Sequence, residues 1–135
     1  MSMTKAEMKD FLSRGHLARI ATVKVDGSPH VTPVWFHWEN MELFIVIYRD
    51  SLKVKNIKRD NRVAVAIDVP DGKGVILEGG AQISTEGVEE VTRKVSAKYV
   101  EPTRLDDHVR SVLKTPTVIV RIVPKRIISW DYSKR

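Results

Sequence analysis

The feature that most constrains the fold is a series of short apolar segments of strand length, three of which are followed by a tight-turn signal. The turn signals are Asp26-Gly27, Glu39-Asn40 and Pro70-Asp71-Gly72. The segments between them are rich in β-branched residues and partly alternate between apolar and polar positions. Because short turns join antiparallel neighbours, the sequence predicts a mainly β chain, and its length fits one domain over residues 1–135.

We expect six or seven mostly antiparallel strands, the first three of which form a meander. The expected strands cover residues 17–25, 30–38, 42–48, 62–69, 74–84, 117–123 and 126–130. The Gly79-Gly80 pair predicts a bulge or sharp bend in the fifth strand, and Pro124-Lys125 predicts a bend between the last two. A closed or partly closed β-barrel is the natural way to hide so many strand edges.

About four peripheral helices are expected, at residues 4–15, 51–59, 85–99 and 106–113. Thr4 is a suitable N-cap, and Glu7 completes a capping box with it. Gly15 is expected to end this helix at its C′ position. Asp50 or Ser51 can cap the second helix.

Composition excludes several classes of protein. There is no cysteine, so disulfides, thiolate metal sites and cysteine nucleophiles are excluded. No apolar run approaches the ~20 residues of a membrane span, and the polar N-terminus does not resemble a signal peptide. We therefore expect a cytoplasmic protein. The net charge of +6 favours an anionic partner, such as nucleic acid, a membrane surface or a phosphorylated small molecule, unless the lysines are simply solvated.

Motifs of conventional catalysis are missing from the sequence. The histidines, His16, His30, His37 and His108, show no metal-ligand spacing, and each is interpreted as a structural histidine. No phosphate-binding loop or nucleophile elbow is present. We therefore predict no catalytic side chain and no metal site. A bound cofactor would then supply the chemistry, with the protein holding and tuning it.

The segment from Thr32 to Trp35 is one candidate for a cofactor site. Pro33 cannot donate to a sheet ladder, so it marks an edge position or an interruption, where backbone groups stay free for a ligand. The alternative is an edge strand that a proline protects from aggregation.

The segment from Arg49 to Lys53 is a second candidate. Ser51 and the first N–H groups of the following helix suit a phosphate, and Lys53 adds a positive charge. The alternative is a capped, solvated basic helix.

Together these segments resemble the pyridoxamine 5′-phosphate oxidase-like flavin-binding proteins, especially small flavin- or deazaflavin (F420)-dependent oxidoreductases. The matching segments occur in family order and cover residues 17–23, 26–36, 51–57, 61–64, 77–79 and 126–131. The resemblance implies an FMN-binding split β-barrel that forms a homodimer, with two equivalent cofactor sites at the subunit interface.

The resemblance also implies which residues bind the cofactor. They are Thr32, Pro33, Val34, Trp35, Ile47, Ser51, Leu52, Lys53 and Trp130. The first five would line the isoalloxazine and ribityl region, and the next three would hold the phosphate. Trp130 would close the partner subunit's site, or else be an aromatic residue of the core or dimer interface. The oxidase itself has arginine where this chain has Thr32 and Leu52.

The expected function is an FMN-dependent oxidoreductase that exchanges hydride or electrons with a small molecule. One alternative is an F420-dependent reductase, with a wider basic groove that includes Lys53, Lys55 and Arg59. Another is a flavin-binding or regulatory protein without turnover. A nucleic-acid-binding barrel ranks last, because aromatic residues interleaved with lysine are absent from the strands.

The oxidase's C-terminal substrate motif is missing before Arg135, so pyridoxamine phosphate is not expected as substrate. We expect neither a nucleic-acid nor a membrane partner.

Overall fold

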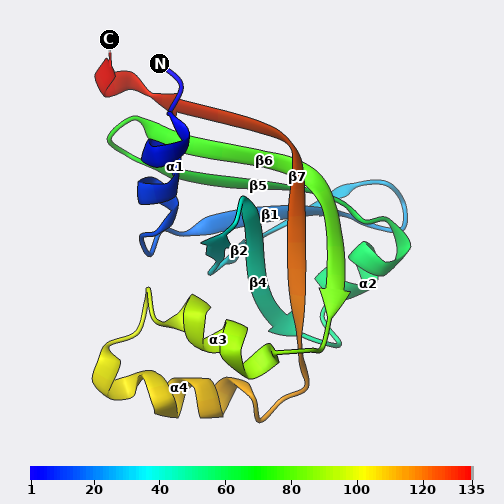
Figure 1. Cartoon of the computed structure of the whole chain (residues 1–135). Coiled ribbons are helices and arrows are strands. Elements are labelled where there is room, and N and C mark those ends of the chain that lie inside the picture. The colour runs from blue at the N-terminus through cyan, green and yellow to red at the C-terminus, as the bar shows by residue number, and fades with distance from the viewer. Residues whose placement is uncertain (135) are drawn as a thin grey trace.

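The computed structural model describes residues 1–134, which form seven strands and four α-helices (Figure 1). The strands are β1 (Ala18–Val23), β2 (Pro29–Val34), β3 (His37–Glu39), β4 (Glu42–Tyr48), β5 (Arg62–Val69), β6 (Lys73–Ser84) and β7 (Thr117–Asp131). The helices are α1 (Lys5–Leu12), α2 (Leu52–Arg59), α3 (Val88–Ser96) and α4 (Leu105–Val112). Short 3-10 turns lie at Pro102–Arg104 and Tyr132–Lys134. The predicted fold class is confirmed.

All seven strands form one antiparallel sheet in the order β2-β1-β5-β6-β7-β4-β3. The long strands β6 and β7 bend together and carry the sheet round into a half-barrel (Figure 1). Their register shifts between Glu78 and Gly79, which confirms the predicted bulge. A Cβ at Gly79 would lie 2.2 Å from the Val123 carbonyl oxygen, so only glycine permits this close approach. The last two expected strands are one continuous strand, β7.

The expected meander of the first three strands is wrong. β2 ends at Val34 and β3 begins at His37, and these two strands occupy opposite edges of the sheet. Trp35 and Phe36 make the connection between the edges. Phe36 is fully buried in the core, so tertiary packing fixes this break. β4 consequently pairs with β3 and β7, and not with β2.

The apolar core fills the inside of the curled sheet. Its largest fully buried side chains include Phe36, Leu12, Ile20, Leu43, Ile45, Ile67, Leu77 and Ile122. Helix α2 contributes Val54 and Ile57 to this core. The buried amide of Asn56 donates from Nδ2 to Thr22 Oγ1 at 3.0 Å. Because this bond satisfies buried polar groups on both elements, it fixes α2 against β1.

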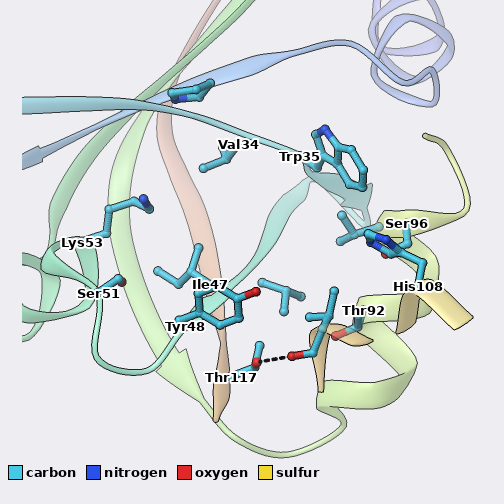
Figure 2. A pocket seen from close by; sticks show the side chains of 14 residues that line it. Val34, Trp35, Ile47, Tyr48, Ser51, Lys53, Thr92, Ser96, His108 and Thr117 are labelled. Carbon is cyan, nitrogen blue, oxygen red and sulfur yellow. Dashed lines mark hydrogen bonds between the residues drawn. The ribbon is translucent and has the colours of Figure 1, made fainter. Parts of the chain in front are cut away.

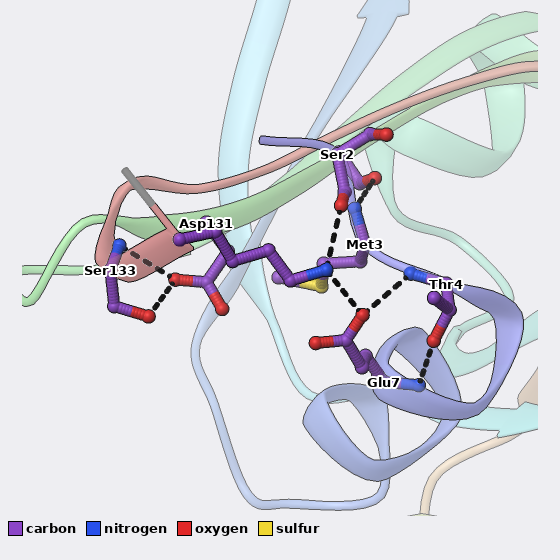
Figure 3. A network of polar contacts seen from close by, with 8 residues as sticks. Ser2, Met3, Thr4, Glu7, Asp131 and Ser133 are labelled. Atoms are coloured by element: carbon purple, nitrogen blue, oxygen red, sulfur yellow. Dashed lines mark hydrogen bonds and ion pairs between the residues drawn. The ribbon is translucent and has the colours of Figure 1, made fainter.

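Helix α1 and the C-terminal turn are joined by a polar network (Figure 3). Thr4 Oγ1 accepts from the Glu7 amide at 3.1 Å, and Glu7 Oε1 accepts from the Thr4 amide at 2.9 Å, which confirms the capping box. Lys134 Nζ donates to Glu7 Oε1 at 2.5 Å and to the Ser2 carbonyl at 3.0 Å. The bond from Lys134 and the Thr4 amide lower the pKa of Glu7 to about 2. The two ends of the described chain therefore lie side by side.

The predicted role of Gly15 is wrong. Helix α1 ends at Leu12 with Ser13 as its C-cap, before Gly15 is reached. A Cβ at Gly15 would instead lie 2.4 Å from the Lys98 carbonyl oxygen. Glycine is needed because the backbone after α3 packs directly on the loop after α1.

Helices α3 and α4 form a hairpin below the sheet, near the ends of β4, β6 and β7 (Figure 1). α3 buries Thr92, Val95 and Ser96, and α4 buries Val109. Arg93 Nη1 donates to Asp106 Oδ1 at 2.6 Å and joins the two helices. Within residues 1–134, no helix has the length and apolar character needed to span a membrane.

Candidate functional site

A pocket of about 330 Å³ lies between the edge of the sheet and the α3–α4 hairpin (Figure 2). Its lining residues come from β2, β4, the start of α2, both helices of the hairpin and the start of β7. They are Pro33, Val34, Trp35, Val46, Ile47, Tyr48, Ser51, Lys53, Thr92, Val95, Ser96, His108, Val112 and Thr117. Most of these side chains are apolar or aromatic, which is typical of a small-molecule site.

The strand wall of the pocket, as we call the side made by β2, β4 and the start of α2, is mainly apolar. Val34 and Ile47 point into the pocket from two different strands, and the Tyr48 ring lies beside Ile47 (Figure 2). Ile47 is only 9% exposed, because it also belongs to the hydrophobic core. A flat, largely apolar ring system fits this surface.

The start of α2 forms the polar end of the strand wall. Ser51 is the N-cap, and its Oγ accepts from the Val54 amide at 3.5 Å, so the predicted cap is confirmed. The first N–H groups of a helix have no intrahelical partner and favour an anion. Lys53 extends toward the pocket (Figure 2), and its burial lowers its pKa. Within residues 1–134 no carboxylate pairs with Lys53, so a half-buried cation lacks a counterion.

Six of the nine predicted cofactor-binding residues line the pocket. They are Pro33, Val34, Trp35, Ile47, Ser51 and Lys53. The sequence-based prediction thus brought together residues from three separate elements. That they bind a cofactor stays a prediction.

The other three predicted residues lie outside the pocket lining. Thr32 precedes Pro33 on β2, and its buried Oγ1 has no hydrogen-bond partner in the described part of the chain. Leu52 is 46% exposed on α2. Trp130 packs on the backbone of Gly74, where a Cβ would lie 2.1 Å from the indole ring. Its expected role in the partner subunit's site stays a prediction.

The helix wall of the pocket, made by α3 and α4, was missed by the sequence analysis. It contributes Thr92, Ser96 and His108, which were not among the predicted site residues. One signal for it exists in the sequence. Thr92 and Ser96 are four residues apart, as are His108 and Val112, so each pair shares one face of its helix.

Aromatic contacts fix Trp35 between the two walls. Its ring stacks on Tyr99 with centroids 4.5 Å apart and planes at 5°, and it lies 5.5 Å from the His108 ring. The Tyr99 hydroxyl donates to the His16 carbonyl at 2.7 Å, so the stack is tied to the loop after α1. The indole is therefore held in one orientation at the edge of the pocket.

The charge of the pocket lining favours an anionic ligand. Its ionisable side chains are Tyr48, Lys53 and His108, and no carboxylate is among its lining residues. A second hollow, of about 710 Å³, lies between α1 and the β5–β6 turn. Its four carboxylates, those of Glu7, Asp10, Asp71 and Asp131, outnumber the cations of Arg14 and Lys73, so this hollow suits a phosphate less well.

An antiparallel sheet curled into a half-barrel, with an apolar pocket at its edge, defines the class of split-barrel proteins. The chain belongs to the pyridoxamine 5′-phosphate oxidase family, whose sequence model matches residues 4–131. The predicted family and split-barrel fold are confirmed.

Named relatives include reductases. A biliverdin reductase of Mycobacterium tuberculosis that depends on reduced F420 is 29% identical over 96 residues, which are 68% of this chain and 69% of that protein.

Solved structures give the same fold. A conserved hypothetical protein from Mycobacterium tuberculosis is 31% identical with a TM-score of 0.83, covering 98% of this chain and 87% of that one. A structure described as an F420 reductase is 25% identical with a TM-score of 0.71, covering 88% of this chain and 94% of that one. A FAD-binding protein from Mesorhizobium loti, at 19% identity and a TM-score of 0.69, supports the fold alone; it covers 96% of this chain and 95% of that one.

Proposed function

We propose that this protein is an oxidoreductase that uses reduced F420 to reduce a small-molecule acceptor. The observation that carries the proposal is the pocket itself, in which a mainly apolar wall ends at Ser51 and at Lys53, whose ammonium pairs with no carboxylate within residues 1–134. Such a surface suits a planar ring joined to an anionic group. F420 is preferred over FMN because two named relatives, at 29% and 25% identity, are F420-dependent reductases.

The residues of the pocket fit a deazaflavin or a flavin in the same way. Val34, Trp35 and Ile47 would contact the ring, while Ser51, Lys53 and the first N–H groups of α2 would hold the phosphate. When bound, the reduced cofactor supplies hydride to the acceptor. The protein positions the ring beside the acceptor and keeps water away from it.

Of the three basic residues expected to bind the F420 tail, only Lys53 lines the pocket. Arg59 donates to the Val23 carbonyl and to Asn56 Oδ1, so it is occupied in holding α2 to β1. Lys53 faces the pocket, and Lys55 is exposed on the helix. FMN stays a second candidate, because Ser51, Lys53 and the first N–H groups of α2 lie close together and suit a single terminal phosphate.

A homodimer forms part of this proposal, with the second copy on the outer face of the sheet. Small and apolar side chains cross that face on neighbouring strands, where Val31 pairs with Ala21, Ala21 with Ala64, and Ile76 with Ile128. Val31 is 58% exposed and Ile128 is 38% exposed. Burying this face would remove apolar surface from water, and light scattering at several concentrations would detect the dimer.

The direct test is to titrate the purified protein with F420 and with FMN, following ligand binding by calorimetry. We expect F420 to bind, and reduced F420 to be oxidised when biliverdin or the quinone menadione is added. Binding of FMN without F420 would reverse the order of the two candidates. Binding of neither, or oxidation by neither acceptor, would contradict the proposed function.

Replacing Lys53 tests the phosphate end of the pocket. We expect Lys53→Ala to weaken cofactor binding by about 1.5–3 kcal/mol, roughly 10- to 150-fold, because a charged hydrogen bond to the phosphate is lost. Lys55→Ala is the matched control, since it removes the same charge from a position two residues along the helix, which faces elsewhere. Equal effects of the two substitutions would show that only general charge matters.

A further inference from the structure

We propose that His108 donates the proton that accompanies hydride transfer to the acceptor. Its ring then takes up a new proton from a surface hollow beside Tyr99 and Ser111, on the side away from the pocket. This inference rests on the proposed function. His108 would be a general acid, which the sequence analysis did not identify, and the helix wall would contribute to the reaction.

The position of His108 carries the inference. The side chain reaches from α4 into the pocket beside Trp35 and Ser96 (Figure 2). The same residue lines a separate surface hollow of about 600 Å³, together with Tyr99, Ser111 and three charged side chains. The imidazole therefore borders both the pocket and a space open to solvent, as a proton relay requires.

The His108 ring is half-buried, and neither of its nitrogens is among the buried polar atoms of residues 1–134 that lack a partner, so water or a ligand can reach both. Over residues 1–134, His108 makes no hydrogen bond or ion pair, and its contact with Trp35 is a tilted ring contact at 5.5 Å. By contrast, His37 Nε2 lies 3.0 Å from Glu39 Oε1, outside the pocket. His16 Nε2 and His30 Nδ1 also lack a partner in the described part of the chain, but both atoms are buried, whereas the His108 ring is open to a ligand in the pocket.

The other ionisable groups around the pocket are less suited to this step. Lys53 lies at the opposite end of the pocket from His108, where the phosphate is proposed to bind (Figure 2). Of the side chains lining the pocket, only histidine belongs to a class that changes charge between pH 5 and 8. The charged and titratable groups that face His108 are Tyr48 and Lys53 in the pocket, and Tyr99, Glu101, Arg104 and Asp107 toward the hollow.

The reduced deazaflavin would supply a hydride, which is two electrons and one hydrogen nucleus, to an acceptor carbon conjugated to a carbonyl or imine. The imidazolium N–H bond of His108 would break, and its proton would go to the acceptor atom where negative charge develops. The cofactor would then be two electrons poorer and His108 would be neutral. Water in the outer hollow then returns a proton to the ring.

The test compares His108→Gln with the matched control His37→Gln in the whole protein. Glutamine keeps a polar side chain but cannot deliver a proton near neutral pH. We expect His108→Gln to bind F420 within about twofold of the wild-type affinity and to lose about 10²- to 10⁴-fold in kcat with biliverdin or menadione. The wild-type kcat should fall as pH rises and the imidazolium is lost, and this dependence should be absent from the variant. His37→Gln should behave as wild type.

A second readout needs no turnover. An imidazolium next to an indole quenches its fluorescence, so the emission of Trp35 in the ligand-free protein should titrate with pH. The titration should disappear in His108→Gln and in Trp35→Phe, and it should persist in His37→Gln.

The possible failures are distinguishable. A His108→Gln variant that keeps the wild-type rate and pH profile, or that loses F420 affinity in step with rate, would overturn the inference and leave the proposed function standing. An emission that does not titrate would also overturn it. A wild-type protein that binds neither cofactor, or whose bound cofactor reduces neither acceptor, would overturn the proposed function and this inference with it.

Discussion

The two walls of the pocket differ in how the chain holds them. On the strand wall, β4 pairs with β3 on one side and β7 on the other, and Ile45 is fully buried behind it. The helix wall is held by side chains, which include the buried Val95 and Val109, the bond from Tyr99 to the His16 carbonyl and the ion pair between Arg93 and Asp106. An exposed ion pair contributes little, so the helix wall should open at a lower free energy than the sheet.

This difference matches the proposed division of roles. The strand wall, which the core makes rigid, would meet the cofactor ring, which is the same whichever acceptor is reduced. The helix wall, with Thr92, Ser96 and His108, would meet the acceptor, which must enter and leave. Two substitutions and a change of pH test whether the two walls differ in stability.

The largest effect is expected from Ile45→Ala behind the strand wall. Ile45 is 0% exposed, so truncation leaves a cavity and should lower the free energy of unfolding by about 2–5 kcal/mol. Urea denaturation measures this loss. Val123→Ala on β7 is the control, because that side chain is 37% exposed and should cost much less. Similar losses for the two variants would contradict a rigid strand wall.

Gly15→Ala should act on the helix wall with a smaller effect. Its new Cβ would lie 2.4 Å from the Lys98 carbonyl oxygen, and relieving the clash should cost about 1–3 kcal/mol. We expect amide hydrogen exchange to speed up in α3 and α4 more than in β4. The exposed neighbour Arg14→Ala should leave exchange unchanged. Equal acceleration in β4 would mean that the two walls open together.

The smallest effect is a pH dependence at the end of α3. Burial of Lys98, whose Nζ lies 3.6 Å from the centre of the Phe36 ring, lowers its pKa from 10.5 to about 8. Between these values the unfolded chain binds more protons than the folded one, so stability should rise with pH above about 8. The rise should be on the order of 1 kcal/mol, because partial exposure screens the effect.

Tyr99 opposes this rise in stability and limits it to pH values below about 10. Burial raises the pKa of Tyr99 from 10.0 to about 12, so the folded state keeps a proton that the unfolded chain loses, and stability falls above pH 10. Melting temperatures from pH 7 to 10 should therefore rise in the wild type. They should rise less in Lys98→Met, where only the smaller contribution of Lys53, whose pKa burial also lowers, remains. An unchanged slope would exclude Lys98 as the cause.

Local signals in the sequence were sufficient for most of the fold. The capping box of Thr4 and Glu7, the cap at Ser51 and the bulge at Gly79 each depend on residues close together in the chain, and each was predicted correctly. The break at Trp35 and Phe36 was not predicted. Both residues are as typical of a strand as their neighbours, and only the burial of Phe36 in a core formed by distant segments sets the break.

The strand wall was predictable and the helix wall was not, for a related reason. Val34 and Ser51 occur in segments that match those of the family in the same order along the chain. They could therefore be predicted as site residues without coordinates. His108 and Thr92 reach the pocket because the α3–α4 hairpin docks below the sheet, and that docking depends on the tertiary contacts of Tyr99 with Trp35 and His16.

The connection between β2 and β3 has a consequence for how the protein can tolerate change. Only Trp35 and Phe36 join the two edges of the seven-stranded sheet, and one of them lines the pocket while the other is buried in the core. An inserted residue there would displace the indole from Tyr99 even if both strands kept their partners. Insertions should thus be tolerated in the β1–β2 turn near Gly27 and rejected at this connection.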